Sequence, residues 1–102
     1  LEHDALGEVP VPRDRLWGAQ TERALRHFAI GAPRYRWSRP VIRALGLVKQ
    51  AAALANADLQ VIDSARAVLI ADAAAAVAAG DWDDEFPLLV FQTGSGTQTH
   101  MN

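Results

Sequence analysis

The 102-residue sequence contains no cysteine and only three histidines. Without cysteine the chain forms no disulfide, offers no thiolate nucleophile and has no Cys-ligated metal site. His3, His27 and His100 are far apart, and there is no HExxH pattern, which argues against a zinc site. The composition therefore predicts no metal site and no disulfide framework, and it fits a reducing, cytoplasmic location.

The chain also lacks a charge excess of one sign and a long hydrophobic run. Ten basic and twelve acidic side chains give a formal net charge of −2, which provides no basic field for nucleic acid or an anionic membrane. The longest nearly apolar run, Ala65 to Ala79, is interrupted by Arg66 and Asp72 and is too short to span a bilayer. We expect one domain over residues 1–102, with neither nucleic acid nor a membrane as partner.

The first third of the chain predicts an extended arm and one short helix. Residues 5–12 contain a glycine and two prolines, which favour extended backbone. In residues 20–28, Leu25 and Phe28 lie three positions apart with charged residues between them, and glycine and proline follow at positions 31 and 33. This pattern predicts a helix from residue 20 or 21 to about residue 28.

Two longer helices are predicted in the middle of the chain. Ser38 is suited to be a helix N-cap, and Pro40 fits the first turn that follows it. From there an apolar stripe about five turns long implies a partner helix beside it: Val41, Leu45, Val48, Ala52, Ala55 and Leu59. Asp63 or Ser64 begins a second, alanine-rich helix that Gly80 ends. We expect an antiparallel helical hairpin turning near residues 60–63, and a mainly α fold.

An acidic run follows the second helix and consists of Asp81, Asp83, Asp84 and Glu85. Such a run could hold a cation or supply paired carboxylates for acid–base chemistry, but the ligand spacing of an EF-hand is missing. A solvated loop at the helix exit is the favoured interpretation. The apolar connector 86–91, which Pro87 keeps non-helical at its start, then leads to a glycine-rich turn.

This turn, residues 93–97 with the sequence TGSGT, carries the main functional signal. Its two glycines let the backbone approach a ligand, its three hydroxyls add donors, and a helix starting near Thr97 would favour an anion such as a carboxylate or phosphate. The residues alone also fit a plain glycine turn in which Ser95 or Thr97 is an ordinary cap. A P-loop is disfavoured, because no Gly-Lys-Ser/Thr follows the glycines.

Three segments together resemble one family. They are Leu16-Trp17-Gly18-Ala19-Gln20-Thr21, then Asp83-Asp84-Glu85-Phe86-Pro87-Leu88, then Gln92-Thr93-Gly94-Ser95-Gly96-Thr97-Gln98 followed by Met101-Asn102. From about residue 4 to residue 102, the chain resembles the N-terminal region of the fumarase/aspartase superfamily, on the class II fumarate hydratase branch. The resemblance implies an N-terminal lyase domain, residues 1–102, that ends in a glycine-rich substrate loop.

The resemblance also implies roles for residues of the turn. Ser95, Gly96 and Thr97 would bind a carboxylate of a C4 dicarboxylate, fumarate or L-malate. Thr93, His100 and Asn102 would be their neighbours. His100 departs from the family pattern, since fumarases commonly carry asparagine at this position.

In such enzymes water adds reversibly to fumarate, giving L-malate, as a base removes the C3 proton and an acid assists departure of hydroxide. The family's base is a serine on a mobile loop, with a histidine also at the site, and both belong to regions downstream of residue 102. No catalytic residue is therefore expected in this chain, which would be an inactive fragment of a homotetrameric enzyme that uses no metal or organic cofactor. The end of the chain, directly after the turn and without a helix stop signal, agrees with a fragment.

Two other interpretations remain. The chain could belong to an aspartate ammonia-lyase or a related C4-dicarboxylate lyase, although that branch usually has smaller residues in place of Thr93 and Ser95. It could also be a non-catalytic helical interaction module that binds a partner helix along the apolar stripe between Val41 and Leu59.

Overall fold

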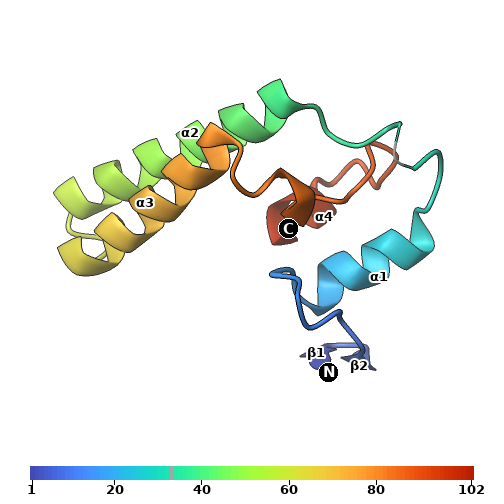
Figure 1. Ribbon diagram of the computed structural model, residues 1–102. Helices are drawn as coiled ribbons and strands as arrows, with labels where there is room; N and C mark the ends of the chain where they lie inside the picture. Colours follow the sequence, from blue (N-terminus) through green and yellow to red (C-terminus); the bar gives the residue numbers. More distant parts are fainter. Residues whose placement is uncertain (33) are drawn as a thin grey trace. The chain divides into compact units, whose positions relative to one another are not determined.

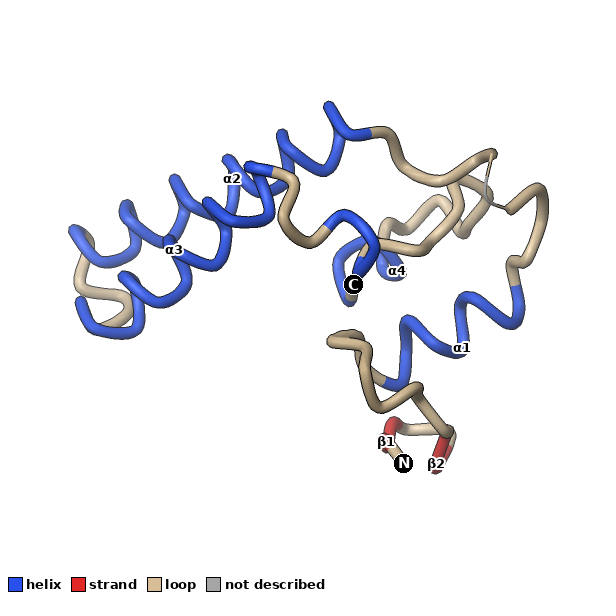
Figure 2. The backbone as a smooth tube through the Cα atoms, viewed as in Figure 1, coloured by secondary structure: helices blue, strands red, loops and turns tan. Residues whose placement is uncertain are grey.

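The chain is mainly α-helical, as predicted. The computed structural model describes residues 1–32 and 34–102. Its elements follow the order β1 (Glu2–Asp4), β2 (Gly7–Val9), α1 (Ala19–His27), α2 (Arg39–Asp58), α3 (Ser64–Ala79), the 3-10 helix η1 (Asp83–Glu85) and α4 (Thr97–Met101) (Figures 1 and 2). They form two compact units, one of residues 1–37 with 84–102 and one of residues 38–83.

The first residues form a two-stranded antiparallel sheet in which Glu2 pairs with Val9 and Asp4 with Gly7. Asp4 closes the turn by accepting the Leu6 N–H at 2.8 Å, and Gly7 has a φ of 107°, which a residue with a side chain rarely adopts. The extended arm predicted over residues 5–12 is therefore confirmed at residues 7–9. The pairing of these residues with residues 2–4 was not predicted.

Arg23 of α1 fastens this small sheet. Its Nε donates to Asp4 Oδ2 at 2.7 Å, and its Nη2 donates to the carbonyl oxygen of Gly7 at 3.0 Å. The Asp4 side chain is 8% exposed. The hydrogen bond from Arg23, supported by the Leu6 N–H against the opposing effect of desolvation, holds the pKa of Asp4 below its ordinary value.

Removing this carboxylate should therefore weaken the fold in a pH-dependent way. A carboxylate whose pKa is lower in the folded chain stabilises the fold above its unfolded pKa of about 4, and this stabilisation disappears as the pH falls through the lower, folded pKa. We expect Asp4→Asn to lower the urea midpoint at neutral pH, and the difference from wild type to shrink as the pH falls through the lowered pKa of Asp4. The exposed Asp14 provides the control Asp14→Asn. A loss for Asp4→Asn that stays constant with pH would contradict the ion-pair explanation.

Helix α1 begins one or two residues before the predicted start and ends one residue before the predicted end. The proline at position 33, part of the predicted stop signal, lies outside the described residues. The inward face of α1 consists of Ala19, Thr21 and Ala24, which are all buried. Trp17, just before the helix, donates its Nε1–H to Glu22 Oε2 at 3.0 Å. The indole thus finds the partner that a half-buried tryptophan requires.

The apolar connector before the glycine turn forms part of the same core. Leu88 and Leu89 are 4% and 5% exposed. Leu89 forms an isolated antiparallel bridge with Arg36, and the Val90 N–H donates to the Tyr35 carbonyl oxygen at 2.8 Å. The chain is therefore firmly anchored immediately before the turn begins.

The second unit is the predicted helical hairpin, in which α2 and α3 lie side by side and run in opposite directions (Figure 2). The Asp63 side chain caps α3 by accepting the Arg66 N–H at 2.8 Å, and Gly80 ends it with a φ of 99°. The Arg39 guanidinium donates to the carbonyl oxygens of Val77 at 3.0 Å and Ala78 at 2.9 Å. These contacts satisfy carbonyls that the end of α3 would otherwise leave unpaired.

The face of α2 that contacts α3 is not the predicted stripe. The buried residues of α2 are Ile42, Gly46 and Ala53, and those of α3 are Ala67, Ala71 and Ala74. A Cβ placed on Gly46 would lie 2.9 Å from both the Ala74 carbonyl oxygen and the Ala78 nitrogen. The helices approach too closely at Gly46 for a side chain there, so the partner helix that the stripe implies is not α3.

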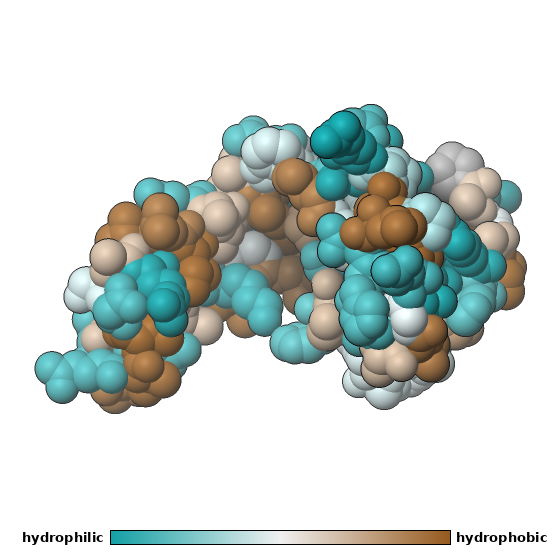
Figure 3. All heavy atoms as spheres, turned by 90° about the horizontal axis from the view of Figure 1, so that it is seen from below, coloured by the Kyte–Doolittle hydropathy of each residue, from teal (hydrophilic) through white to brown (hydrophobic). Residues whose placement is uncertain are grey.

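Large apolar side chains of the hairpin are consequently exposed within its unit. They are Leu45, Leu47, Val48, Leu54, Leu59, Val61, Val68, Leu69 and Ile70. Hydrophobic residues accordingly gather on the surface of the hairpin (Figure 3). In the described part of the chain, no helix combines the length and hydropathy needed to cross a membrane.

Candidate functional site

The glycine turn gathers its hydroxyls in one row. Thr93 Oγ1 lies 2.9 Å from Ser95 Oγ, which lies 3.1 Å from Thr97 Oγ1. Thr93, Ser95 and Thr97 are all exposed. Gly96 has a φ of 76° and immediately precedes α4, so the turn requires glycine at this position.

The direction of the hydrogen bonds along this row is set by Gln98, which accepts at the Thr93 end. Thr93 Oγ1 donates to Gln98 Oε1 at 2.8 Å, and an amide oxygen can only accept. Because each hydroxyl has one proton, Ser95 then donates to Thr93, and Thr97 donates to Ser95. The Thr97 hydroxyl is the free end of the row, and a small rotation would direct its proton toward an incoming carboxylate.

Space for a ligand exists above the backbone of the turn. A Cβ placed on Gly94 or Gly96 would have no atom within 4 Å outside its chain neighbours. The main chain is therefore open on that side, and a carboxylate could come within hydrogen-bonding distance of the hydroxyl row. This arrangement suits anion recognition. The Ser95 hydroxyl also accepts the Thr97 N–H at 3.4 Å, so a long capping contact at the start of α4 coexists with the exposed hydroxyl row.

The other sequence-predicted site residues have different positions. Thr93 belongs to the hydroxyl row, as described above. His100 is exposed on α4, three residues after Thr97 and hence on the same side of that helix. Asn102 instead donates its Nδ2–H to the Glu85 carbonyl oxygen at 2.9 Å, so its amide joins the end of the described chain to η1. Thr93 thus lies within the turn, His100 lies on the helix that follows it, and Asn102 makes a structural contact.

Two glutamines that flank the turn were not predicted to have a role. Gln98 accepts the hydrogen bond from Thr93. Gln92 donates to the Leu89 carbonyl oxygen at 3.0 Å and accepts from Thr99 through both the backbone N–H, at 3.1 Å, and Oγ1, at 2.8 Å. The sequence offered one signal that was not used: both glutamines belong to the segment that carries the family resemblance.

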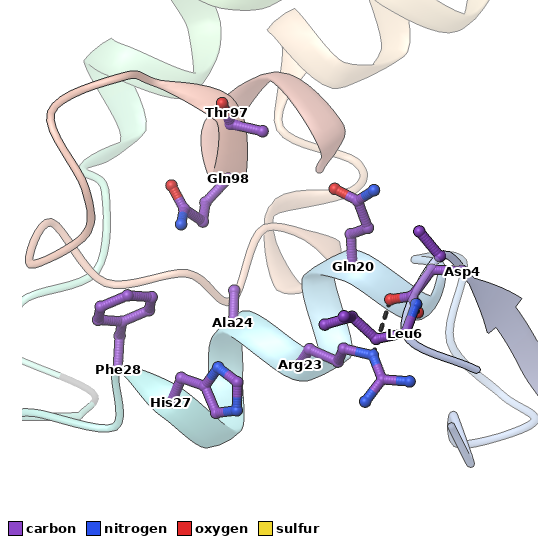
Figure 4. Close-up of a pocket in the computed structure, with 10 residues that line it drawn as sticks. Asp4, Leu6, Gln20, Arg23, Ala24, His27, Phe28, Thr97 and Gln98 are labelled. Carbon is purple, nitrogen blue, oxygen red and sulfur yellow. Dashed lines mark hydrogen bonds and ion pairs between the residues drawn. The ribbon is translucent and has the colours of Figure 1, made fainter. Parts of the chain in front are cut away.

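A cavity of about 250 Å³ lies beside the turn, between α1 and α4 (Figure 4). Gln20 and His27 line it from α1, and Thr97 and Gln98 line it from α4. Arg23, the cation at its edge, is already paired with Asp4 at 2.7 Å. The cavity therefore offers polar groups near the turn but no uncompensated positive charge.

The acidic run after α3 is more structured than predicted. Asp83 is ion-paired with Arg39 within the hairpin unit. Glu85 accepts the Leu16 N–H at 2.7 Å and pairs with Arg15 at 3.4 Å. Two of the four acids thus have structural partners, whereas Asp81 and Asp84 are exposed, as expected for a solvated loop. Within residues 1–32 and 34–102, no group of three or more potential His, Asp or Glu metal ligands is found.

The fold and the turn together define a class of protein. Residues 7–102 match the family model described as lyase, so the chain belongs to this lyase family. The names of its relatives specify a branch of this family. It is 57% identical over 102 residues to the class II fumarate hydratase of Thermus aquaticus and 50% identical over 101 residues to the mitochondrial fumarate hydratase of Saccharomyces cerevisiae. These alignments cover 100% and 99% of this chain but only 22% and 21% of the relatives.

Solved structures lead to the same branch. A class II fumarase from Schistosoma mansoni superposes with a TM-score of 0.90 and 39% identity, over 96% of this chain and 20% of that one. A native fumarate lyase:delta crystallin from Brucella melitensis gives 0.86 and 34%, over 98% of this chain and 22% of that one. The resemblance to class II fumarate hydratases is thereby confirmed. The chain spans about a fifth of the length of these relatives.

Proposed function

We propose that the protein containing this chain is a fumarate hydratase that interconverts fumarate and L-malate, and that Ser95, Gly96 and Thr97 bind one carboxylate of the substrate. The observation that supports this role is the exposed hydroxyl row, with Oγ–Oγ separations of 2.9 and 3.1 Å. Two matched relatives, named class II fumarate hydratase and mitochondrial fumarate hydratase, support the choice of reaction.

The row suits a carboxylate for a simple chemical reason. A carboxylate has two oxygens that only accept hydrogen bonds, and hydroxyl protons can satisfy them without a bulky cation. Hydration of fumarate requires that the charge developing on the carboxylate beside the reacting carbon be stabilised. A carboxylate held by the turn would fix the substrate's position while catalytic groups from elsewhere in the protein act on C3.

We further propose that the active protein is a homotetramer that functions in the cytoplasm. The exposed apolar side chains of the hairpin support association, because apolar surface of this kind is normally covered in a complete protein. A site with one wall in this chain and its base elsewhere also agrees with assembly from several segments or subunits.

The reaction is tested on the full-length protein with two parallel assays. One follows loss of fumarate in buffer, and the other follows loss of fumarate in the presence of ammonium. We expect fumarate to be consumed without ammonium and L-malate to accumulate. Turnover that depends on ammonium and yields aspartate would instead assign the protein to the ammonia-lyases, and absence of both reactions would favour the helical interaction module.

A further inference from the structure

The side chain of Gln92 connects two segments on either side of the glycine turn. Its Nε2 donates to the carbonyl oxygen of Leu89, three residues earlier, at 3.0 Å. Its Oε1 accepts from Thr99, seven residues later, at 3.1 Å from the N–H and 2.8 Å from Oγ1. The turn is thus closed at its base by one partly buried amide.

The helix at this end needs such a partner. Gly96, the residue before α4, has no side chain to cap the helix, and the first N–H groups of a helix have no partner within it. Thr99 supplies the third N–H of α4, the group that an N-cap side chain usually accepts from. Gln92 provides this acceptor from outside the helix, so the turn can keep glycine where its φ of 76° requires it.

The other end of the connection is a fixed point in the core. Leu89 is 5% exposed and pairs with Arg36 in the isolated bridge. Gln92 therefore links the first turn of α4 by hydrogen bonds to the buried backbone at Leu89. Among the uncharged side chains of this length, only an amide carries both the donor and the acceptor that this connection uses.

We propose that Gln92 is a positioning residue for carboxylate binding: it holds the first turn of α4 so that Ser95 and Thr97 keep the spacing of the hydroxyl row. This inference rests on the proposed function of the turn. Among the described residues, the Gln92 side chain makes its hydrogen bonds to Leu89 and Thr99 and none to the hydroxyl row, so its effect should be on the geometry of binding and not on the chemical step.

The test compares Gln92→Glu and Gln92→Met in the full-length protein. Both should raise KM for fumarate about tenfold with kcat changed less than about twofold, because a contact equal in ground and transition states affects KM alone. An ionised glutamate keeps the acceptor but loses the donor, whereas a protonated glutamate regains a donor. The ratio of the Gln92→Glu KM to the wild-type KM should therefore fall as the pH is lowered, and the ratio for Gln92→Met should stay constant.

A matched control is Gln50→Glu, which makes the same change on α2 in the hairpin unit. It should leave KM unchanged. Variants with wild-type KM at every pH would overturn the inference, as would a Gln92→Glu ratio that does not respond to pH. A fall in kcat together with a rise in KM and a lowered melting temperature would show a merely structural role and would also overturn the inference.

A second measurement separates this inference from the proposed function. Hydrogen exchange of a peptide over residues 96–102, in the full-length protein without substrate, reports the connection whether or not fumarate is hydrated. Gln92→Met should accelerate exchange there several-fold while a peptide within α3 stays unchanged. Unchanged exchange over residues 96–102 would contradict the role of Gln92, whereas an inactive wild-type protein with accelerated exchange in the variant would contradict only the proposed reaction.

Discussion

Replacing Ser95 with alanine should lower kcat/KM for fumarate by about ten- to a hundredfold in the full-length protein. Ser95 occupies the middle of the hydroxyl row, 2.9 Å from Thr93 and 3.1 Å from Thr97. On binding, the Ser95 hydroxyl would turn its proton from Thr93 toward the carboxylate. Alanine removes that donor and also leaves Thr97 without its acceptor. A hydrogen bond to a charged group contributes about 1.5–3 kcal/mol, and each 1.4 kcal/mol corresponds to about a tenfold change.

The control for this variant is Ser64→Ala. Ser64 is exposed at the start of α3, in the hairpin unit, and the same hydroxyl is lost there. We expect kcat/KM to stay within twofold of wild type for this control, and the melting temperature of Ser95→Ala to stay close to that of wild type, because Ser95 is exposed. Full activity of Ser95→Ala would remove the hydroxyl row from the proposed carboxylate site.

Replacing Gly46 with leucine should destabilise the hairpin by about 3 kcal/mol or more, at the upper end of overpacking effects. The new Cβ would lie 2.9 Å from two backbone atoms of α3, which cannot rotate away as a side chain could. Helix propensity favours leucine over glycine by up to about 1 kcal/mol, so the expected loss is a net value in which the clash prevails. The two helices would have to separate, exposing the small buried residues between them.

Urea unfolding followed by circular dichroism measures this effect. The matched control is Ala44→Leu on the same helix, where the side chain is exposed and lies outside the apolar stripe. The control should have a midpoint equal to that of wild type, and Gly46→Leu a clearly lower one. Equal midpoints for both variants would mean that the helices do not approach closely at Gly46.

The helices could be predicted because their signals are local. Asp63 and Gly80 flank α3 as cap and stop, and both perform these roles in the structure. Ser38 and Pro40 lie at the predicted start of α2, although the Ser38 side chain makes no capping hydrogen bond. Such residues act on the backbone within one turn of the helix, so the sequence alone contains the relevant physics.

The contact face of the hairpin could not be predicted in the same way. A regular stripe from Val41 to Leu59 suggested burial, because large apolar residues usually form helix contacts. The hairpin instead uses the smallest residues, Gly46 and the alanines of α3, since close approach of two backbones excludes bulky side chains. Periodicity identifies apolar faces, but it does not say which face the neighbouring helix takes.

The site was predicted in part for a related reason. The turn and its hydroxyls lie together in the sequence, whereas the partners of Gln92 depend on the path that the chain takes from Leu89 to Thr99. The strand at residues 2–4 was missed likewise, since Arg23 lies 19 residues from its partner Asp4. Contacts of this kind depend on tertiary structure, and no local pattern in the sequence indicates them. The assignment of Ser95, Gly96 and Thr97 to substrate stays a prediction until it is measured.

The direction of the hydroxyl row has a consequence for turnover. In the structure each hydroxyl proton of the row has an acceptor, with Gln98 Oε1 at the end of the row. If the turn binds a dicarboxylate as proposed, the Thr97 hydroxyl would turn back to donate its hydrogen bond to Ser95 as the ligand leaves, and no donor would be left unpaired. Donors that can pair with each other again lose less when a carboxylate leaves than a charged arginine would, because no buried charge is left unpaired. The same row of three hydroxyls that admits the ligand would thus also favour its release.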